Sequence, residues 1–184
     1  MISKIKKGCL FFGTGVYKMG QDKKEKILKV YFENPEKGFT VRELVSLTKI
    51  PRATIQNKLT NLKKEKLITK DNFAWDSLLF NTKKINYYVE EIIKSGLIDF
   101  LVEALNPSCI ILFGSFRKGD STIESDLDLF VESSVKKKLD LSKFEKKLAH
   151  KIDLFVEPDI SNLQDNLFNN VINGIKLFGS FKIK

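Results

Sequence analysis

The first part of the chain carries apolar residues at helical spacing. Between residues 22 and 32 they recur on one side of a predicted helix, which the turn-forming pair Asn34-Pro35 ends. Thr40 and Glu43 have the spacing of a capping box, in which the hydroxyl reaches forward and the carboxylate reaches back. We therefore expect a second helix that begins after Thr40 and ends near Lys49.

A third helix is predicted after Pro51, because proline suits the first helical position. Its buried face is expected to consist of Ile55, Leu59 and Leu62. Residues 67–69 then alternate toward the turn pair Asp71-Asn72, and residues 73–80 could return as a second strand. The first half of the chain thus predicts three helices followed by a β-hairpin.

The second half alternates helices with short apolar strands. Residues 81–105 are interpreted as a linking helix with a weak point at Gly96. The further elements expected are strands at 109–113, 127–131 and 151–156 and a helix at 139–149. The fold class predicted is α+β, with a small mixed β-sheet and flanking helices after the helical unit.

Charge is unevenly distributed along the 184 residues. Residues 1–94 carry 20 lysines and arginines against 10 carboxylates, whereas residues 95–184 carry 12 against 13. The basic half is therefore expected to contact a polyanion and the second half to have another task. The alternative is a lysine-rich protein whose helices have solvated faces.

The apolar runs are too short to span a membrane, which takes roughly 18 residues. Residues 1–20 begin like a weak signal peptide, but Gly13 and Gly15 interrupt the apolar run, so secretion is not favoured. The Gly-Thr-Gly sequence there is interpreted as a turn. Cys9 and Cys109 are far apart in sequence, which favours a reducing, cytoplasmic location over a disulfide framework.

One face of the predicted third helix carries side chains that hydrogen-bond to bases and phosphates. They are Arg52, Thr54, Gln56, Asn57, Thr60, Asn61 and Lys64. With the helices before it and the hairpin after it, the segment 21–80 resembles a winged helix-turn-helix DNA-binding domain of prokaryotic regulators. Small three-helix modules also serve as protein-docking domains, and the charge asymmetry is what favours DNA. A palindromic DNA site would favour a homodimer.

Two aspartates stand at the start of the strand predicted at 127–131. Alternate residues of a strand point to one face, so Asp126 and Asp128 are expected to project side by side. They repel each other unless a cation lies between them. Gly114 lets the backbone turn, and Ser115 would open a helical turn whose free N–H groups favour phosphate oxygens. A triphosphate with Mg²⁺ satisfies both halves of the pattern.

Asp153 supplies a third carboxylate, within the apolar strand predicted at 151–156. A third carboxylate is needed if one group receives the proton of an attacking hydroxyl while two hold metal. An acidic residue in a buried strand is costly unless it is paired or metal-bound. The alternative is that Asp153 lies at a strand edge and faces solvent.

The spacing of Gly114-Ser115, ten residues, Asp126-Leu127-Asp128 and a later Asp153 resembles the hallmark of minimal nucleotidyltransferases of the polymerase-β-like superfamily. The resemblance covers residues 106–184, including a closing helix-to-strand segment. It implies that Ser115 and the Gly114 backbone hold the outer phosphates of a nucleoside triphosphate. It also implies that Asp126 and Asp128 bind Mg²⁺, with Asp153 at the metal site orienting or deprotonating the acceptor hydroxyl. Pyrophosphate would be the leaving group.

Arg117 and Lys118 depart from the family pattern. Relatives usually have a small residue and then arginine before the loop glycine, where this chain has Arg117-Lys118-Gly119. Both residues are expected to bind the nucleotide, although lysine lacks the bidentate fork of arginine. The alternative is a solvated loop. The only histidine, His150, is given no role.

The leading hypothesis is an enzyme that transfers a nucleoside monophosphate, AMP from ATP, to a hydroxyl. Minimal domains of this family are often antitoxins that modify a small helical toxin, so a protein acceptor is one option. Fusion to a winged helix is similar to archaeal proteins of the group. The alternatives are a DNA-binding regulator, whose nucleotidyltransferase fold senses nucleotide or scaffolds a dimer, and an inactive nucleotide-binding relic.

The domain organisation expected from these patterns has four parts. They are an N-terminal segment at 1–20, the winged helix-turn-helix at 21–80, the linking helix at 81–105 and the nucleotidyltransferase domain at 106–184.

Overall fold

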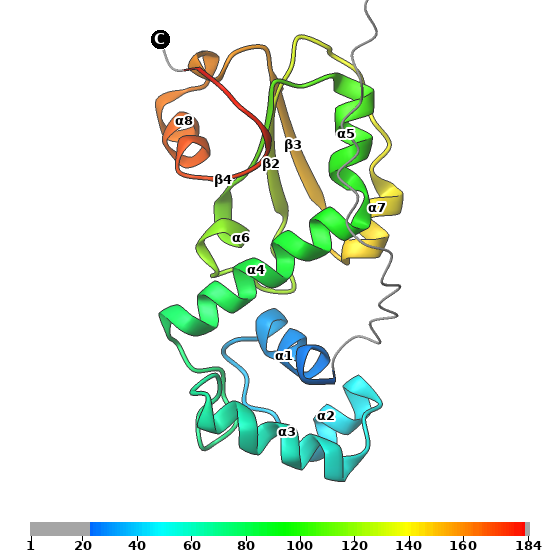
Figure 1. The fold of residues 1–184 in the computed structure, drawn as a ribbon, viewed down its shortest axis with the longest axis vertical. Coiled ribbons are helices and arrows are strands. Elements are labelled where there is room, and N and C mark those ends of the chain that lie inside the picture. Colours follow the sequence, from blue (N-terminus) through cyan, green and yellow to red (C-terminus); the bar gives the residue numbers. More distant parts are fainter. Residues whose placement is uncertain (1–22, 183–184) are drawn as a thin grey trace, which may run out of the picture.

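A computed structural model of the protein describes residues 23–182. A helical unit lies at one end and a small sheet at the other, with the long helix α4 (Leu78–Ser95) running between them (Figure 1). The helical unit consists of α1 (Lys23–Glu33), α2 (Val41–Thr48) and α3 (Arg52–Lys64). The remaining elements are α5 (Leu97–Leu105), β1 (Cys109–Leu112), α6 (Gly114–Lys118), β2 (Leu127–Glu132), α7 (Ser142–Leu148), β3 (Ile152–Glu157), the 3₁₀ turn η1 (Ile160–Asn162), α8 (Asp165–Ile172) and β4 (Ile175–Gly179).

The three N-terminal helices predicted from the sequence are confirmed. The capping box is present at the start of α2, because the Glu43 N–H donates to Thr40 Oγ1 at 3.2 Å and the Thr40 N–H donates to Glu43 Oε2 at 2.9 Å. The apolar stripe of α3 is buried, as expected, through Ile55, Leu59 and Leu62.

The prediction of a second strand at 73–80 is wrong, except for a single bridge near its start. The hairpin is reduced to one bridge between Ile68 and Ala74, and α4 already begins at Leu78. The Ser77 hydroxyl caps that helix by accepting a hydrogen bond from the Phe80 N–H at 3.2 Å. Phe80 is then buried by helical packing instead of strand pairing.

The predicted linking helix is broken at Gly96, which the sequence marks as a weak point. Gly96 has φ of +82°, a left-handed conformation that ends α4 and starts α5 in a new direction. Both helices pack on the sheet, and neither α4 nor any other helix within residues 23–182 is long and apolar enough to cross a bilayer. The predicted Gly-Thr-Gly turn and Cys9 lie outside the described residues.

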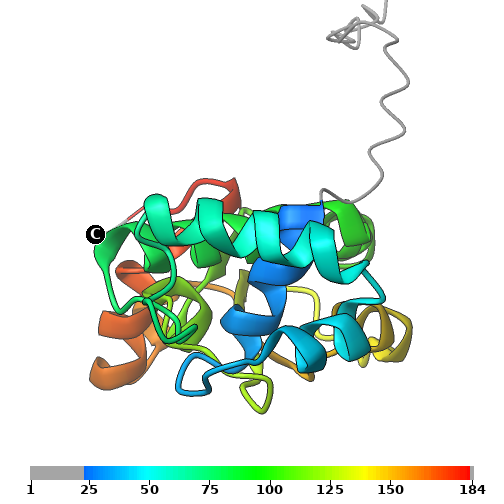
Figure 2. The same cartoon turned by 90° about the horizontal axis from the view of Figure 1, so that it is seen from below.

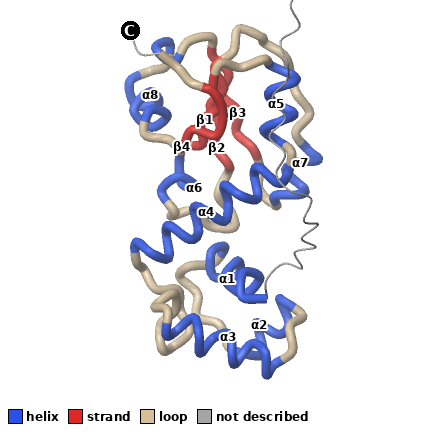
Figure 3. Tube along the Cα trace, in the orientation of Figure 1, coloured by secondary structure: helices blue, strands red, loops and turns tan. Residues whose placement is uncertain are grey.

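The four strands form a mixed sheet in the order β3-β2-β1-β4 (Figure 3). Strand β1 is antiparallel to β2 and β4, whereas β2 and β3 are parallel. Leu127 and Leu129 of β2 face the cluster built with α4, α5 and α7, whereas Phe130 faces the smaller cluster that includes Val171 of α8. The alternation of β2 therefore places Asp128 on the same face as Phe130, the α8 side of the sheet.

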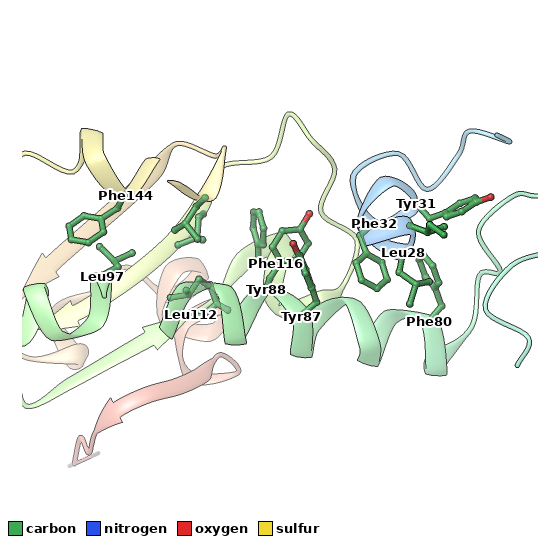
Figure 4. Packing of buried hydrophobic residues seen from close by; sticks show 14 of the residues in the cluster. Leu28, Tyr31, Phe32, Phe80, Tyr87, Tyr88, Leu97, Leu112, Phe116 and Phe144 are labelled. Atoms are coloured by element: carbon green, nitrogen blue, oxygen red, sulfur yellow. The ribbon is translucent and has the colours of Figure 1, made fainter. Parts of the chain in front are cut away.

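Aromatic side chains join the helical unit to the sheet across α4 (Figure 4). Phe32 of α1 lies 5.6 Å from Tyr87, measured between ring centroids, and Tyr88 lies 4.7 Å from Phe116 of α6. Buried apolar residues of both halves belong to one continuous cluster. Because α4 packs on both sides, the helical unit is held against the segment that carries the predicted site.

Candidate active site

The sheet register brings two of the predicted carboxylates together. Asp128 of β2 is paired with Asp153 of β3 in the parallel ladder, where neighbouring strands lie about 4.8 Å apart. Asp126 directly precedes β2, two residues before Asp128, and its charge also acts on Asp128. Strand β3 is at the sheet edge, and Asp153 is exposed. Asp153 therefore faces solvent and still lies beside Asp128 in the ladder.

Gly114 lies directly beneath the Asp128 carboxylate. A Cβ atom built on Gly114 would be 1.9 Å from Asp128 Oδ2, and the glycine has φ of +68°. The Phe113 N–H also donates to the Asp128 carbonyl at 3.1 Å. The turn from β1 into α6 therefore passes so close to the carboxylate that only glycine fits.

The pKa of Asp128 reports this crowding. Burial raises the pKa of Asp128 above that of an ordinary aspartate, and the charges of Asp153 and Asp126 raise it further. The charges of Asp153 and Asp126 thus both act on the Asp128 carboxyl. Such a cluster favours either a proton or a cation.

The nucleotide-binding residues predicted from the sequence lie on α6. Gly114 and Ser115 form its first turn, where backbone N–H groups have no intrahelical partner. Arg117 is half-buried and Lys118 is exposed in the last turn, before Gly119 ends the helix in a left-handed conformation. The structure thus brings Gly114 next to Asp128, and Ser115, Arg117 and Lys118 follow within the same short helix.

The loop at 119–126, between α6 and Asp126, is held by three separate elements. Lys84 Nζ of α4 donates to the Ser121 carbonyl oxygen. The Ile123 N–H donates to the Glu33 carbonyl of α1 at 2.9 Å. His150 Nδ1 lies 2.9 Å from the Ser125 carbonyl oxygen. The loop that delivers Asp126 is therefore fixed from both halves of the molecule.

His150 and Lys84 are site residues that the sequence reasoning missed. The His150 ring is buried and lies edge-on to Tyr88 and Phe116, at 5.6 and 4.9 Å between centroids. Burial lowers the pKa of His150, so the neutral ring donates its Nδ1–H to the Ser125 carbonyl. Lys84 is only 1% exposed, in a helix whose sequence offers no sign of a buried charge.

We expect Lys84→Met to change how stability depends on pH. Burial lowers the pKa of Lys84 from 10.5 to about 8, although Asp120 opposes the shift. The pKa of Lys84 is lower in the folded than in the unfolded protein, so folding is most favourable above pH 10.5, where the lysine is neutral in both states. This contribution to the free energy of unfolding is lost as pH falls through 8. Denaturant titrations should therefore show the wild type gaining stability relative to Lys84→Met between pH 8 and 10.5.

Lys83→Met is the matched control, since Lys83 is the preceding residue and only half-buried. The gain of the wild type over Lys83→Met across the same pH range should be smaller than its gain over Lys84→Met. If the stability of the two variants depended on pH in the same way, the lowered pKa of Lys84 would be contradicted.

The carboxylates fit a divalent cation by their chemistry and position. Hard cations such as Mg²⁺ take carboxylate oxygens, and Asp128 and Asp153 are neighbours by register. Within residues 23–182 no group of three or more potential ligands is already gathered around one metal position. The repulsion that raises the pKa of Asp128 is what a bound cation would relieve.

Comparison with known proteins characterises this part of the chain. Residues 94–177 match the family model of the nucleotidyltransferase domain. The matched region begins in the last turn of α4 and ends within β4, so it contains the sheet, α6 and all three carboxylates. This region of the chain is therefore similar to nucleotidyltransferase domains. No curated protein and no solved structure matched the chain.

The side chains predicted to contact DNA lie outside the matched region. They lie on α3, at the end of the molecule away from the sheet (Figures 1 and 2). Thr54 is half-buried, and the exposed ones are Arg52, Gln56, Asn57, Thr60, Asn61 and Lys64.

Proposed function

We propose that the protein is a Mg²⁺-dependent nucleotidyltransferase that transfers a nucleoside monophosphate to a hydroxyl group. The observation that carries this is the pairing of Asp128 with Asp153 directly above Gly114, within a region that matches the nucleotidyltransferase family. ATP, with AMP as the transferred group, is the donor that the superfamily resemblance favours.

Each part of the site has a role in this reaction. The backbone at Gly114 and the Ser115 side chain hold the outer phosphates at the start of α6, and Arg117 and Lys118 add positive charge. Asp126 and Asp128, with Asp153 beside them, hold the cation. When bound, Mg²⁺ neutralises charge on the phosphates.

The chemical step exchanges one oxygen–phosphorus bond for another. The acceptor oxygen forms a bond to the α-phosphorus, and the bond from that phosphorus to the oxygen bridging the β-phosphate breaks. Pyrophosphate leaves, and the hydroxyl proton passes to Asp153, which is exposed and therefore reachable by an acceptor. Asp153 is assigned this role because Asp128 is partly covered by the Gly114 backbone.

Label transfer tests the proposal. Each of the four ribonucleoside triphosphates, labelled at the α-phosphate, is incubated with Mg²⁺, the protein and candidate acceptors. We expect a labelled acceptor with one preferred nucleotide, and no labelling by the double variant Asp126→Ala/Asp128→Ala. Labelling that survives in the double variant would overturn the proposal.

A second candidate function is DNA binding through α3. The exposed row of polar and basic side chains on α3 favours it, as does the helix order of a winged helix. Binding to the upstream promoter fragment should then weaken steeply with salt, and Arg52→Ala should weaken it. Absence of a mobility shift at low salt would count against it. An autoregulating protein could carry out both functions.

A further inference from the structure

The side chain of His150 joins the loop before β2 to the turn before β3. Its ring nitrogen Nδ1 donates a hydrogen bond of 2.9 Å to the carbonyl oxygen of Ser125, the residue directly before Asp126. Between the two chain segments, the Leu127 N–H also donates to the Lys151 carbonyl at 2.8 Å. The histidine therefore adds a hydrogen bond ahead of the backbone ladder.

This hydrogen bond continues the register of the ladder. Leu127 is paired with Ile152 in the parallel sheet, so the same register carried back by two residues sets Ser125 opposite His150. Hydrogen bonds of a parallel ladder are evenly spaced, and the Ser125 carbonyl is the next acceptor before β2. The His150 side chain thus extends the link between the two segments beyond the ends of both strands.

Packing and backbone conformation both fix the position of the His150 ring. The residue is 6% exposed, and its ring lies edge-on to Tyr88 and Phe116, which pack against each other beside α4 (Figure 4). Ala149, the residue before it, ends α7 with φ of +59°, a left-handed conformation that is costly for a residue with a Cβ atom. Strained conformations of this kind persist where the surrounding structure holds them in place.

The hydrogen bond acts on the last part of the loop at 119–126. The anchors at Ser121 and Ile123 lie earlier in the chain, and Ser125 lies beyond them. The carbonyl of Ser125 and the Cα atom of Asp126 belong to one planar peptide unit. Holding the carbonyl therefore limits where Asp126 can lie.

We infer that His150 is a positioning residue for the proposed transfer, and that its hydrogen bond to Ser125 holds Asp126 where it can share one Mg²⁺ with the strand carboxylates. This role rests on the proposed function, because it belongs to that metal site. Asp128 and Asp153 are held by strand pairing, whereas Asp126 precedes β2. Groups that orient metal ligands change metal affinity by about 10–100-fold when they are removed, although they do not touch the ion.

Two substitutions separate the hydrogen bond from the packing. His150→Asn keeps an N–H donor at the same number of bonds from the backbone, because its amide nitrogen is attached to Cγ, as Nδ1 is. It leaves space beside Tyr88 and Phe116. His150→Leu fills that space with an apolar side chain of similar size and has no donor. A histidine that only packs is replaced better by leucine, whereas one that positions Asp126 is replaced better by asparagine.

The test uses the full chain, with Mn²⁺ as the probe of the cation site. Binding is followed by the electron paramagnetic resonance signal of free Mn²⁺, without nucleotide, which would itself bind the ion. Denaturant titration gives the stability of each variant, and transfer of α-label is measured over a range of Mg²⁺ concentrations. Asp126→Ala/Asp128→Ala defines the binding that does not involve the site. Leu59→Ala, which creates a cavity under α3 at the other end of the molecule, controls for lost stability alone.

We expect His150→Leu to bind Mn²⁺ about tenfold more weakly than the wild type and to need more Mg²⁺ for half-maximal transfer. His150→Asn should keep most of the affinity, because it restores the donor. The order of stability should be the reverse, with His150→Asn the less stable of the two, because it leaves the space unfilled. Leu59→Ala should lose stability and bind Mn²⁺ as the wild type does.

Two results would overturn this role of His150. One is a Mn²⁺ affinity of His150→Leu equal to that of the wild type. The other is an affinity that follows stability across all the variants, so that His150→Asn binds Mn²⁺ more weakly than His150→Leu. If the wild type binds no more Mn²⁺ than Asp126→Ala/Asp128→Ala and transfers no label, the proposed function itself fails. The wild-type measurements therefore tell the two failures apart.

Discussion

Asp128→Asn is expected to lower the rate of nucleotidyl transfer by about 10³-fold and, at the same time, to stabilise the metal-free protein. The rate falls because an amide cannot replace the carboxylate as a ligand of the cation. Stability rises because burial and the charges of Asp153 and Asp126 oppose ionisation of Asp128. Solvent screening of the partly exposed carboxylate keeps this gain small.

The pH dependence of this gain has a definite sign. The pKa of Asp128 is raised in the folded protein, so the wild type loses stability relative to Asp128→Asn as pH rises through that pKa. Thermal unfolding without metal, followed from pH 3 to pH 7, should show the difference growing. Mg²⁺ should then stabilise the wild type and have less effect on the variant.

Asp140→Asn is the control for Asp128→Asn. Hydrogen bonds from Ser142 lower the pKa of Asp140, so neutralising it removes a favourable interaction instead of a repulsion. It should leave transfer unchanged and should not raise stability. A stabilised Asp140→Asn, or an Asp128→Asn that transfers normally, would contradict the assignment.

Gly114→Ala is expected to abolish transfer and to destabilise the protein by about 1–3 kcal/mol. The new methyl group would lie 1.9 Å from Asp128 Oδ2, and the backbone has φ of +68°. The carboxylate would have to move, and the turn into α6 would have to open. Denaturant titration and label transfer measure the two effects.

Gly96→Ala separates the collision from the backbone strain. Gly96 has a similar φ of +82°, but nothing lies within 4 Å of a Cβ atom built there. It should therefore lose stability through strain alone and retain transfer. If Gly96→Ala and Gly114→Ala reduced transfer equally, the close approach of Gly114 to Asp128 would not be what the site requires.

Local sequence signals predicted the N-terminal helices and the two strands that carry Asp128 and Asp153. The Thr40–Glu43 capping box and the apolar stripe of α3 fix their helices by interactions within a few residues. Asp126 and Asp128 were recognisable because strand alternation places them on one face, and Asp153 because it interrupts an apolar strand. Register then supplied the pairing of Asp128 with Asp153, which spacing alone does not determine.

The features that were missed depend on contacts between distant segments. Lys84 contacts Ser121, 37 residues away, so nothing in the helical pattern of α4 indicates that it is buried. His150 is recognisable only once Ser125 and Phe116 are next to it. The strand expected through Phe80 failed because the Ser77 cap and packing against Phe32, 5.2 Å away between centroids, favour a helix.

A paired-label experiment tests the central claim most directly. The wild-type protein is incubated with Mg²⁺, acceptor and nucleoside triphosphate labelled in parallel at the α- and at the γ-phosphate. Nucleotidyl transfer predicts α-label on the acceptor and an equal amount of γ-label in pyrophosphate, with both lost in Asp126→Ala/Asp128→Ala. Label from the γ-phosphate on the acceptor, or γ-label released only as inorganic phosphate, would contradict the account.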